Sequence, residues 1–132
     1  MFKRLDHVAI VVADTEAALR IWREKFGLPV LFSETINDGT VRLTHLDLGN
    51  THLQLVEPLT EDHPLAAWLA AHGPGLHHLC LGVDDVGEAS MALRTYDLAP
   101  GEPEPHQGTQ GKRALFLDRN GTGNLQVELT GR

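Results

Sequence analysis

A short stretch of sequence occurs twice in this chain, and its recurrence is the feature that most restricts the fold. The first copy is Asp6–Asp14 and the second is His77–Asp85. In each copy a histidine, His7 or His78, begins a short apolar run, and an aspartate follows seven residues later, just before a helical pattern. One copy would mean little, because Asp often caps a helix that follows a strand. Two copies, 71 positions apart, indicate an internal duplication.

Both halves of the chain predict the same order of strand, helix, strand, strand and strand. In the first half we expect a strand at 5–12, a helix at 15–26, and strands at 29–34, 41–48 and 52–56. In the second half we expect a strand at 78–83, a helix from Asp85 to about Arg94, an irregular segment at 97–111, and strands at 112–118 and 124–129. Neither half is long enough to bury a sheet alone, so the two must share one core.

The domain organisation follows from this duplication. We predict an α+β fold in a single domain over residues 1–132, with βαβββ modules at about 1–60 and 75–132 and a linker helix within 61–74. The Pro and Gly residues of segment 73–75 separate that linker helix from the second module.

Composition excludes several classes of protein. The formal net charge of −7 argues against a nucleic-acid partner. No apolar run approaches the roughly 20 residues that a membrane-spanning helix needs, so we expect no membrane partner. The single cysteine, Cys80, excludes an internal disulfide framework and fits a reducing cytoplasm.

The last strands of the two halves also correspond, and they carry the polar residues that matter most. Gln54 and Glu128 occupy matching positions, 74 residues apart. Because side chains alternate across a strand, Gln54 and Glu128 point away from the neighbouring leucines and valines. His7 and His78 hold the equivalent positions on the first strands. The four strands are therefore expected to present one polar face that lines a cavity.

The residues on that face are typical metal ligands. Neutral imidazole, a carbonyl oxygen and a carboxylate suit divalent ions such as Co²⁺, Mn²⁺, Ni²⁺, Zn²⁺ or Fe²⁺. A lone histidine in a strand is usually only structural, and the symmetric set of four is what favours a metal site. With one anionic ligand and open positions, such a site can polarise a bound carbonyl group.

At this point the sequence resembles the vicinal oxygen chelate superfamily and, within it, the methylmalonyl-CoA epimerase family. The segments that carry the resemblance are Leu5–Ile10, Leu53–Leu59, His63–Ala66, Gly75–Cys80, Gly111–Leu117 and Leu125–Leu129. The resemblance implies a cupped eight-stranded mixed sheet built from paired βαβββ modules, with helices on the outer face. It also implies that His7, Gln54, His78 and Glu128 are the metal ligands.

The reaction implied by the resemblance interconverts (2R)- and (2S)-methylmalonyl-CoA. One base removes the α-proton, the metal stabilises the enolate, and an acid on the other face returns a proton. Glu128 matches one acid–base carboxylate of the family. The other has no counterpart here, since Arg42 or Leu43 stands in its place. His45, or Asp38 from the preceding turn, is the candidate for the second acid–base group.

Other readings stay open on the same scaffold. One is a glyoxalase-type lyase or a ring-cleaving dioxygenase, although Gln54 as a fourth ligand argues against the latter. Another is a metal-free protein that sequesters a ligand, as bleomycin-resistance proteins do. The segment His106–Gly111 is either a loop over the site or an ordinary hairpin connection. Lys112 and Arg113 are either contacts for coenzyme A phosphates or solvated surface cations. A homodimer is expected because small superfamily members often pair.

Overall fold

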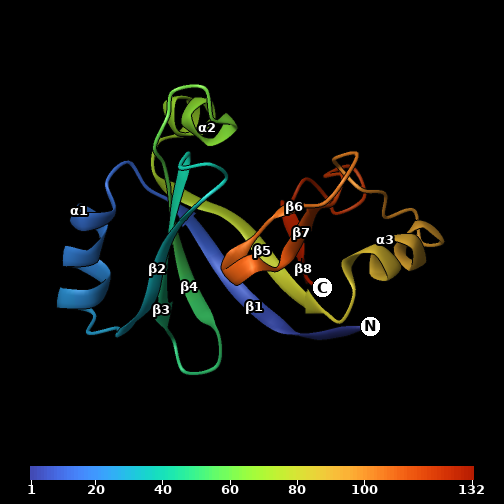
Figure 1. Ribbon diagram of the computed structural model, residues 1–132, viewed down its shortest axis with the longest axis horizontal. Helices are drawn as coiled ribbons and strands as arrows, with labels where there is room; N and C mark the ends of the chain where they lie inside the picture. The colour runs from blue at the N-terminus through green and yellow to red at the C-terminus, as the bar shows by residue number, and fades with distance from the viewer. The chain divides into compact units, whose positions relative to one another are not determined.

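The computed structural model describes residues 1–132 and contains eight strands and three α-helices (Figure 1). The strands are β1 (Phe2–Val11), β2 (Val30–Ile36), β3 (Val41–Asp47), β4 (His52–Pro58), β5 (Gly75–Val83), β6 (His106–Gln107), β7 (Arg113–Phe116) and β8 (Val127–Gly131). The helices are α1 (Thr15–Leu19), α2 (Pro64–His72) and α3 (Val86–Arg94). The predicted order of strand, helix and three strands is confirmed in both halves. None of the helices has the length and apolar character that crossing a membrane requires.

The strands form one mixed sheet in the order β2-β3-β4-β1-β5-β8-β7-β6. The pair β5–β8 is parallel, whereas β2–β3, β3–β4, β6–β7 and β7–β8 are antiparallel. In both modules the first strand lies beside the last, β1 beside β4 and β5 beside β8. The α+β class with an eight-stranded mixed sheet is therefore confirmed. The chain divides into two compact units, Val8–His77 and Met1–His7 together with His78–Arg132.

In the unit Val8–His77, a capped helix follows the first strand as expected. The Asp14 carboxylate accepts hydrogen bonds from the backbone N–H groups of Glu16 and Ala17, at 2.9 and 3.3 Å. The predicted helix 15–26 is α-helical only as far as Leu19. It continues as a wider π-helical stretch over Arg20–Lys25. The Phe26 N–H then donates to the Ile21 carbonyl five residues back, as the wider turn requires.

The sheet of this unit buries both of its faces. On one face Leu53 and Leu55 pack beside α1, in a cluster that includes Leu19. On the other, Val56 lies in a second apolar cluster against which Trp68 of α2 packs. Because successive side chains of β4 point to opposite faces of the sheet, they contribute to two separate apolar clusters.

A partly buried carboxylate ties α1 to this sheet. Glu57 of β4 accepts hydrogen bonds from the backbone N–H and the hydroxyl of Thr15, at 2.8 and 2.7 Å. The bonds satisfy a donor at the first turn of α1 that has no partner within the helix.

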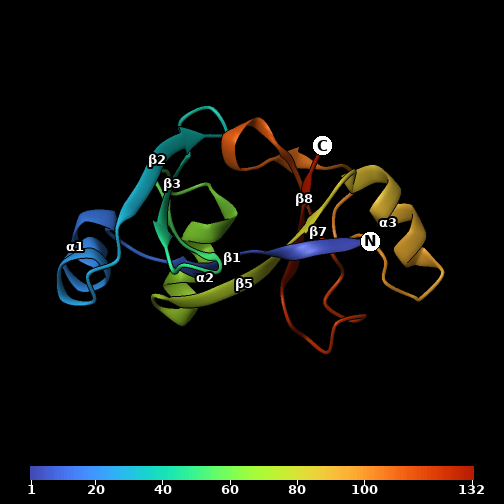
Figure 2. The same ribbon diagram turned by 90° about the horizontal axis from the view of Figure 1, so that it is seen from below.

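In the second unit, α3 packs on β7 and β8, as both Figure 1 and Figure 2 show. The core there joins Val86 and Leu93 of the helix to Leu115 and Leu129 of the sheet. The predicted strand 112–118 is shorter, at Arg113–Phe116.

The last strand of this unit begins later than predicted and packs unusually closely. The expected strand 124–129 starts only at Val127, because Asn124 adopts a left-handed backbone with φ 71° and belongs to the preceding turn. At the far end of β8, a Cβ atom on Gly131 would collide with the carbonyl oxygen of Val83. Only glycine allows so close an approach between the two backbones.

Candidate metal centre

Three of the four residues that the sequence assigns to a metal site converge in the second unit. His7 Nε2 lies 3.4 Å from His78 Nε2, and Glu128 Oε1 lies 3.6 Å from the former and 3.4 Å from the latter. The three residues come from β1, β5 and β8, and their exposed fractions are only 2%, 7% and 7%. Two imidazole nitrogens and a carboxylate oxygen thus face one another in a buried place.

These distances fit a bound divalent ion. Donor atoms about 2.1 Å from a common ion lie about 3.0 Å apart in an octahedron and about 3.4 Å apart in a tetrahedron. The three observed separations are within a few tenths of an ångström of the tetrahedral value. Three protein ligands with further positions for other groups are typical of catalytic rather than purely structural metal sites. The ligand role of the three residues stays a prediction that the geometry favours.

The parallel pairing of β5 with β8 explains why two of these residues meet. Cys80 lies opposite Glu128 in the register, so both side chains project from the same face of the sheet. His78 precedes Cys80 by two residues and shares that face. Burial raises the pKa of the Cys80 thiol, so this neighbour stays neutral and adds no charge to the centre.

Asp6 orients His7, and sequence reasoning missed it. Its carboxylate lies 2.8 Å from Nδ1 of His7 and also accepts a hydrogen bond of 2.9 Å from Arg4. Burial raises the pKa of Asp6, but the bond with His7 and the nearby cations outweigh this and lower it to about 2. With Nδ1–H donated to Asp6, His7 directs the lone pair of Nε2 toward the centre.

His106 is a second residue that sequence reasoning did not assign to the centre. Its Nε2 lies 3.2 Å from Glu128 Oε2 and its Nδ1 lies 2.8 Å from Glu102 Oε1. The ring stacks on Phe116, whose backbone N–H donates to the other oxygen of Glu102. Burial lowers the pKa of His106, but its two carboxylate partners outweigh burial and raise it to about 9. The ring therefore holds the outer oxygen of Glu128 as a cation at neutral pH.

The segment around His106 is a hairpin connection. His106 pairs with Ala114 across β6 and β7, and a short helical turn spans Thr109–Gly111. The sequence signals for His106 were the high count of eight histidines and its place in a segment that could lie over the site, since its Pro- and Gly-rich surroundings show no periodicity.

Glu128 is ionised in this environment. Burial alone would raise the pKa of its carboxyl group. The neighbouring imidazole groups of His78, His106 and His7 outweigh burial and hold the pKa of the Glu128 carboxyl group well below its usual range. The centre therefore presents a carboxylate with one oxygen toward His7 and His78 and the other toward His106.

The remaining predicted residues, Gln54 and His45, lie in the unit Val8–His77 and contact each other. They are directly opposed on β4 and β3, and their exposed fractions are 3% and 1%. The Gln54 amide nitrogen lies 2.9 Å from His45 Nε2, and His45 Nδ1 lies 3.0 Å from His52 Nδ1. Phe32 stacks on the His45 ring at 4.5 Å. A hydrogen-bonded chain thus runs from Gln54 through His45 to His52. Its two ends, Gln54 and His52, lie two residues apart on β4 and share one face of that strand.

The positions weighed for the second acid–base group also differ in their surroundings. Asp38 is exposed in the turn between β2 and β3. Leu43 is buried among apolar side chains. Arg42 forms an ion pair of 3.1 Å with Glu16. Of the two candidates, Asp38 and His45, only His45 is buried.

Comparison with known proteins gives a consistent family. Residues 6–116 match the Glyoxalase/Bleomycin resistance protein/Dioxygenase superfamily. The chain is 34% identical over 127 residues to the human mitochondrial methylmalonyl-CoA epimerase, covering 96% of this chain and 72% of that one. It is 36% identical over 131 residues to an ethylmalonyl-CoA/methylmalonyl-CoA epimerase of Cereibacter sphaeroides, covering 98% of each.

A solved structure agrees with these sequence relatives. A variant of the Streptomyces coelicolor methylmalonyl-CoA epimerase in complex with 2-nitronate-propionyl-CoA superimposes with a TM-score of 0.89 at 29% identity, covering 99% of this chain and 98% of that one. The resemblance drawn from the sequence motifs is confirmed. The chain therefore belongs to the glyoxalase/bleomycin resistance/dioxygenase superfamily and, within it, to the methylmalonyl-CoA epimerase family.

Proposed function

We propose that the protein is a metal-dependent epimerase that interconverts the 2R and 2S forms of methylmalonyl-CoA. The observation that carries the proposal is the buried cluster of His7, His78 and Glu128, whose spacing fits a divalent ion. Relatives that are named as epimerases of this substrate, and that match nearly the whole chain, support the choice of reaction. Gln54 as a fourth ligand stays a prediction of the sequence resemblance.

Glu128 is the group that we propose to exchange the α-proton. A divalent ion at this centre would supply the Lewis acidity that makes a proton next to a thioester carbonyl easier to remove. Glu128 is ionised at neutral pH, so it is ready to accept that proton. His106 holds one carboxylate oxygen and thereby fixes the plane of the carboxylate during the transfer.

His45 is the proposed acid–base group for the opposite face of the substrate. Histidine is the side chain that most often acts as a general acid or base. Behind it, His52 is only partly buried and is hydrogen-bonded to His45, which gives a route for protons between His45 and solvent.

The first experiment combines metal analysis with proton exchange. Protein stripped with EDTA and reloaded with Co²⁺ is incubated with methylmalonyl-CoA in D₂O, and deuterium at the α-carbon is followed by NMR. We expect about one ion per chain and rapid exchange only in the loaded protein. Metal binding without exchange would refute the epimerase reaction while leaving the metal centre, and glyoxalase and dioxygenase assays would follow.

Substitutions then test the roles of the two proton-transfer groups. We expect Glu128→Gln to abolish exchange, whereas Glu104→Gln, which makes the same change at an exposed acid, should leave it intact. Full exchange in the Glu128→Gln protein would remove this residue from the mechanism. His45→Gln should slow exchange for one enantiomer more than for the other, because two groups on opposite faces serve the two enantiomers.

The predicted homodimer and cytoplasmic location are separate from this reaction. Size-exclusion chromatography with light scattering tests the first, and fractionation of cells that express the protein tests the second.

A further inference from the structure

Glu102 lies in the irregular segment between α3 and β6, yet β7 holds it in a fixed place. The Glu102 carboxylate accepts a hydrogen bond of 2.7 Å from the backbone N–H of Phe116. The N–H of the preceding residue, Gly101, donates to the Phe116 carbonyl at 2.8 Å. A Cβ atom on Gly101 would lie 2.9 Å from the carbonyl oxygen of Leu117, so the two backbones run close together here. Both polar backbone atoms of Phe116 therefore anchor this short stretch of chain.

The second oxygen of this carboxylate holds His106, four residues further along the chain. Glu102 Oε1 lies 2.8 Å from Nδ1 of His106. The residues between them are Pro-Glu-Pro, and each proline ring fixes its own φ angle, so little backbone freedom is lost when the pair meets. The backbone of His106 pairs with Ala114 of β7, and its ring stacks on Phe116 at an interplanar angle of 19°. The imidazole is thus held through its backbone, through one face and through one nitrogen.

The free end of this imidazole determines how the two oxygens of Glu128 are used. Phe116 lies directly opposite Glu128 in the pairing of β7 with β8, so the ring that stacks on Phe116 is brought beside the carboxylate. His106 Nε2 lies 3.2 Å from Oε2 of Glu128. Only Oε1 faces the candidate metal ligands, at 3.4 Å from His78 and 3.6 Å from His7. A carboxylate whose outer oxygen is already bonded offers one oxygen, rather than two, to a metal ion.

We propose that Glu102 is a positioning residue, which acts through His106 to restrict Glu128 to one-oxygen metal binding. Carboxylates bind divalent ions through either one or two oxygens, and a second oxygen would occupy a further coordination position. A catalytic centre needs such positions open for its substrate. Methylmalonyl-CoA offers two oxygen donors, a carboxylate and a thioester carbonyl, so it needs two. The inference rests on the proposed function and adds to it a group that does not touch the ion.

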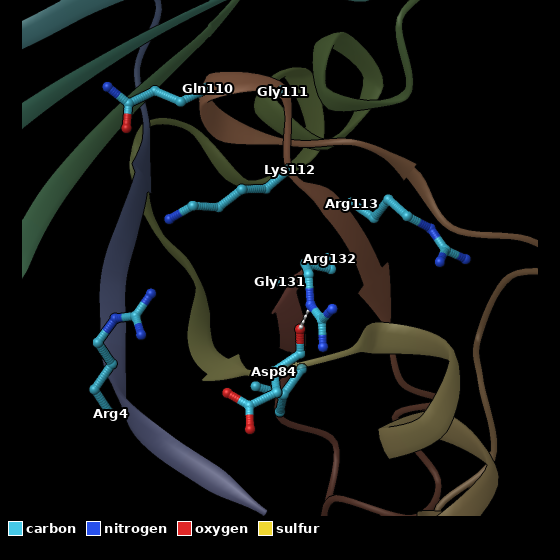
Figure 3. A pocket seen from close by; sticks show the side chains of 9 residues that line it. Arg4, Asp84, Gln110, Gly111, Lys112, Arg113, Gly131 and Arg132 are labelled. Atoms are coloured by element: carbon cyan, nitrogen blue, oxygen red, sulfur yellow. Dashed lines mark hydrogen bonds between the residues drawn. The ribbon is translucent and has the colours of Figure 1, made fainter.

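A cavity of about 610 Å³ in the same unit has a separate lining (Figure 3). Lys112 extends across it toward β1, whereas the guanidinium group of Arg113 points away. None of Glu102, His106 and Glu128 belongs to its lining. The contacts of Glu102 and His106 are therefore directed at the carboxylate of the candidate metal centre and not at this cavity.

The test is the visible absorption of the Co²⁺-loaded protein, which weakens as the ion gains ligand atoms. Glu102→Ala releases the His106 ring, so we expect the absorption per bound ion to fall about twofold. Co²⁺ should bind at least as tightly as to the parent, because the second Glu128 oxygen adds a contact. His106→Phe, which keeps the stacked ring and removes the donor to Glu128, should give the same fall. Adding Glu102→Ala to the His106→Phe protein should change nothing more, because Glu102 acts through His106.

Two variants separate positioning from a general loss of charge or of folding. Glu102→Gln keeps an acceptor for the Phe116 N–H and a polar group for His106, so it should retain the parent absorption. The matched control is Glu104→Ala, which changes an exposed acid between the same two prolines and should also match the parent. Glu102→Asp replaces Glu102→Ala if the latter does not fold. Its carboxylate is one bond shorter and keeps only one of the two hydrogen bonds, and the absorption should fall if His106 is the partner released.

Several results would overturn the inference. Unchanged absorption per ion with weaker Co²⁺ binding in Glu102→Ala would show that Glu102 only tethers the loop. An equal fall in Glu104→Ala, or a further fall in the double variant, would contradict action through His106. A parent protein that binds no Co²⁺ would remove the metal centre and this inference together. A parent that binds Co²⁺ but gives no α-deuterium would refute the epimerase reaction alone, because the absorption test uses no substrate.

Discussion

The ion pairs of His106 predict a pH-dependent stability for the metal-free protein. Its pKa is raised from 6.5 to about 9. At about 1.36 kcal/mol per unit, the two carboxylate partners would stabilise the fold by up to about 3.4 kcal/mol. The side chain is 31% exposed, so screening by solvent lowers a realistic value to about 2 kcal/mol.

The sign of the effect follows from the direction of the shift. A pKa raised on folding means that the folded state binds the proton more tightly than the unfolded state. The stabilisation is therefore complete below pH 6.5 and is lost as the pH rises through about 9. Replacing His106 by Gln removes the titrating group and should remove this dependence.

The measurement is urea unfolding of EDTA-treated protein, followed by tryptophan fluorescence at pH 6.5 and pH 9.5. We expect His106→Gln to lower the free energy of unfolding by about 2 kcal/mol at pH 6.5 and by little at pH 9.5. His72→Gln, on the exposed surface of α2, is the control for general effects of losing a histidine. An equal loss at both pH values, or an NMR titration of His106 near pH 6.5, would refute the reasoning.

Three further predictions concern other features of the fold. Glu57→Ala should destabilise the protein by about 1–3 kcal/mol, because the donors of Thr15 lose their acceptor; urea unfolding checks this. Gly131→Ala should lower the melting temperature strongly because the new methyl group meets the Val83 carbonyl, whereas Gly75→Ala, with nothing within 4 Å, should change it little. Removing the metal with EDTA should lower the melting temperature, and reloading with Co²⁺ should restore it; an unchanged value would contradict a metal centre.

The sequence was sufficient to predict the strands that hold the candidate metal centre, because duplication and alternation act together there. His7 and His78 begin equivalent strands, and Glu128 lies on the strand that pairs with the second of them. Once each module places its first strand beside its last, these side chains must share one face. The meeting of the three also requires β1 beside β5 and β5 beside β8, strands that are far apart in the chain; the pattern predicts the face on which each side chain lies, and the duplication predicts that equivalent strands take equivalent places.

The partners of these residues were not predictable in the same way. Alternation places Asp6 and His7 on opposite faces, yet their side chains lie 2.8 Å apart. His106 lies in a Pro- and Gly-rich segment without periodicity, and it reaches Glu128 only because β6 pairs with β7. Contacts of this kind depend on rotamers and on irregular backbone, for which the hydrophobic pattern carries no signal.

The hydrogen-bonded chain from Gln54 through His45 to His52 has a direction. An amide nitrogen only donates, so His45 accepts at Nε2, carries its proton on Nδ1 and donates that proton to His52. A neutral imidazole has one proton for two nitrogens. Reversing the bond between His45 and His52 therefore also reverses the bond between His45 and Gln54. A donor-only group at position 52 would make His45 donate toward Gln54, and the amide would have to turn its oxygen toward the ring. The hydrogen-bonding role of residue 52, as acceptor or donor, therefore determines whether the oxygen or the nitrogen of the Gln54 amide is left for a ligand.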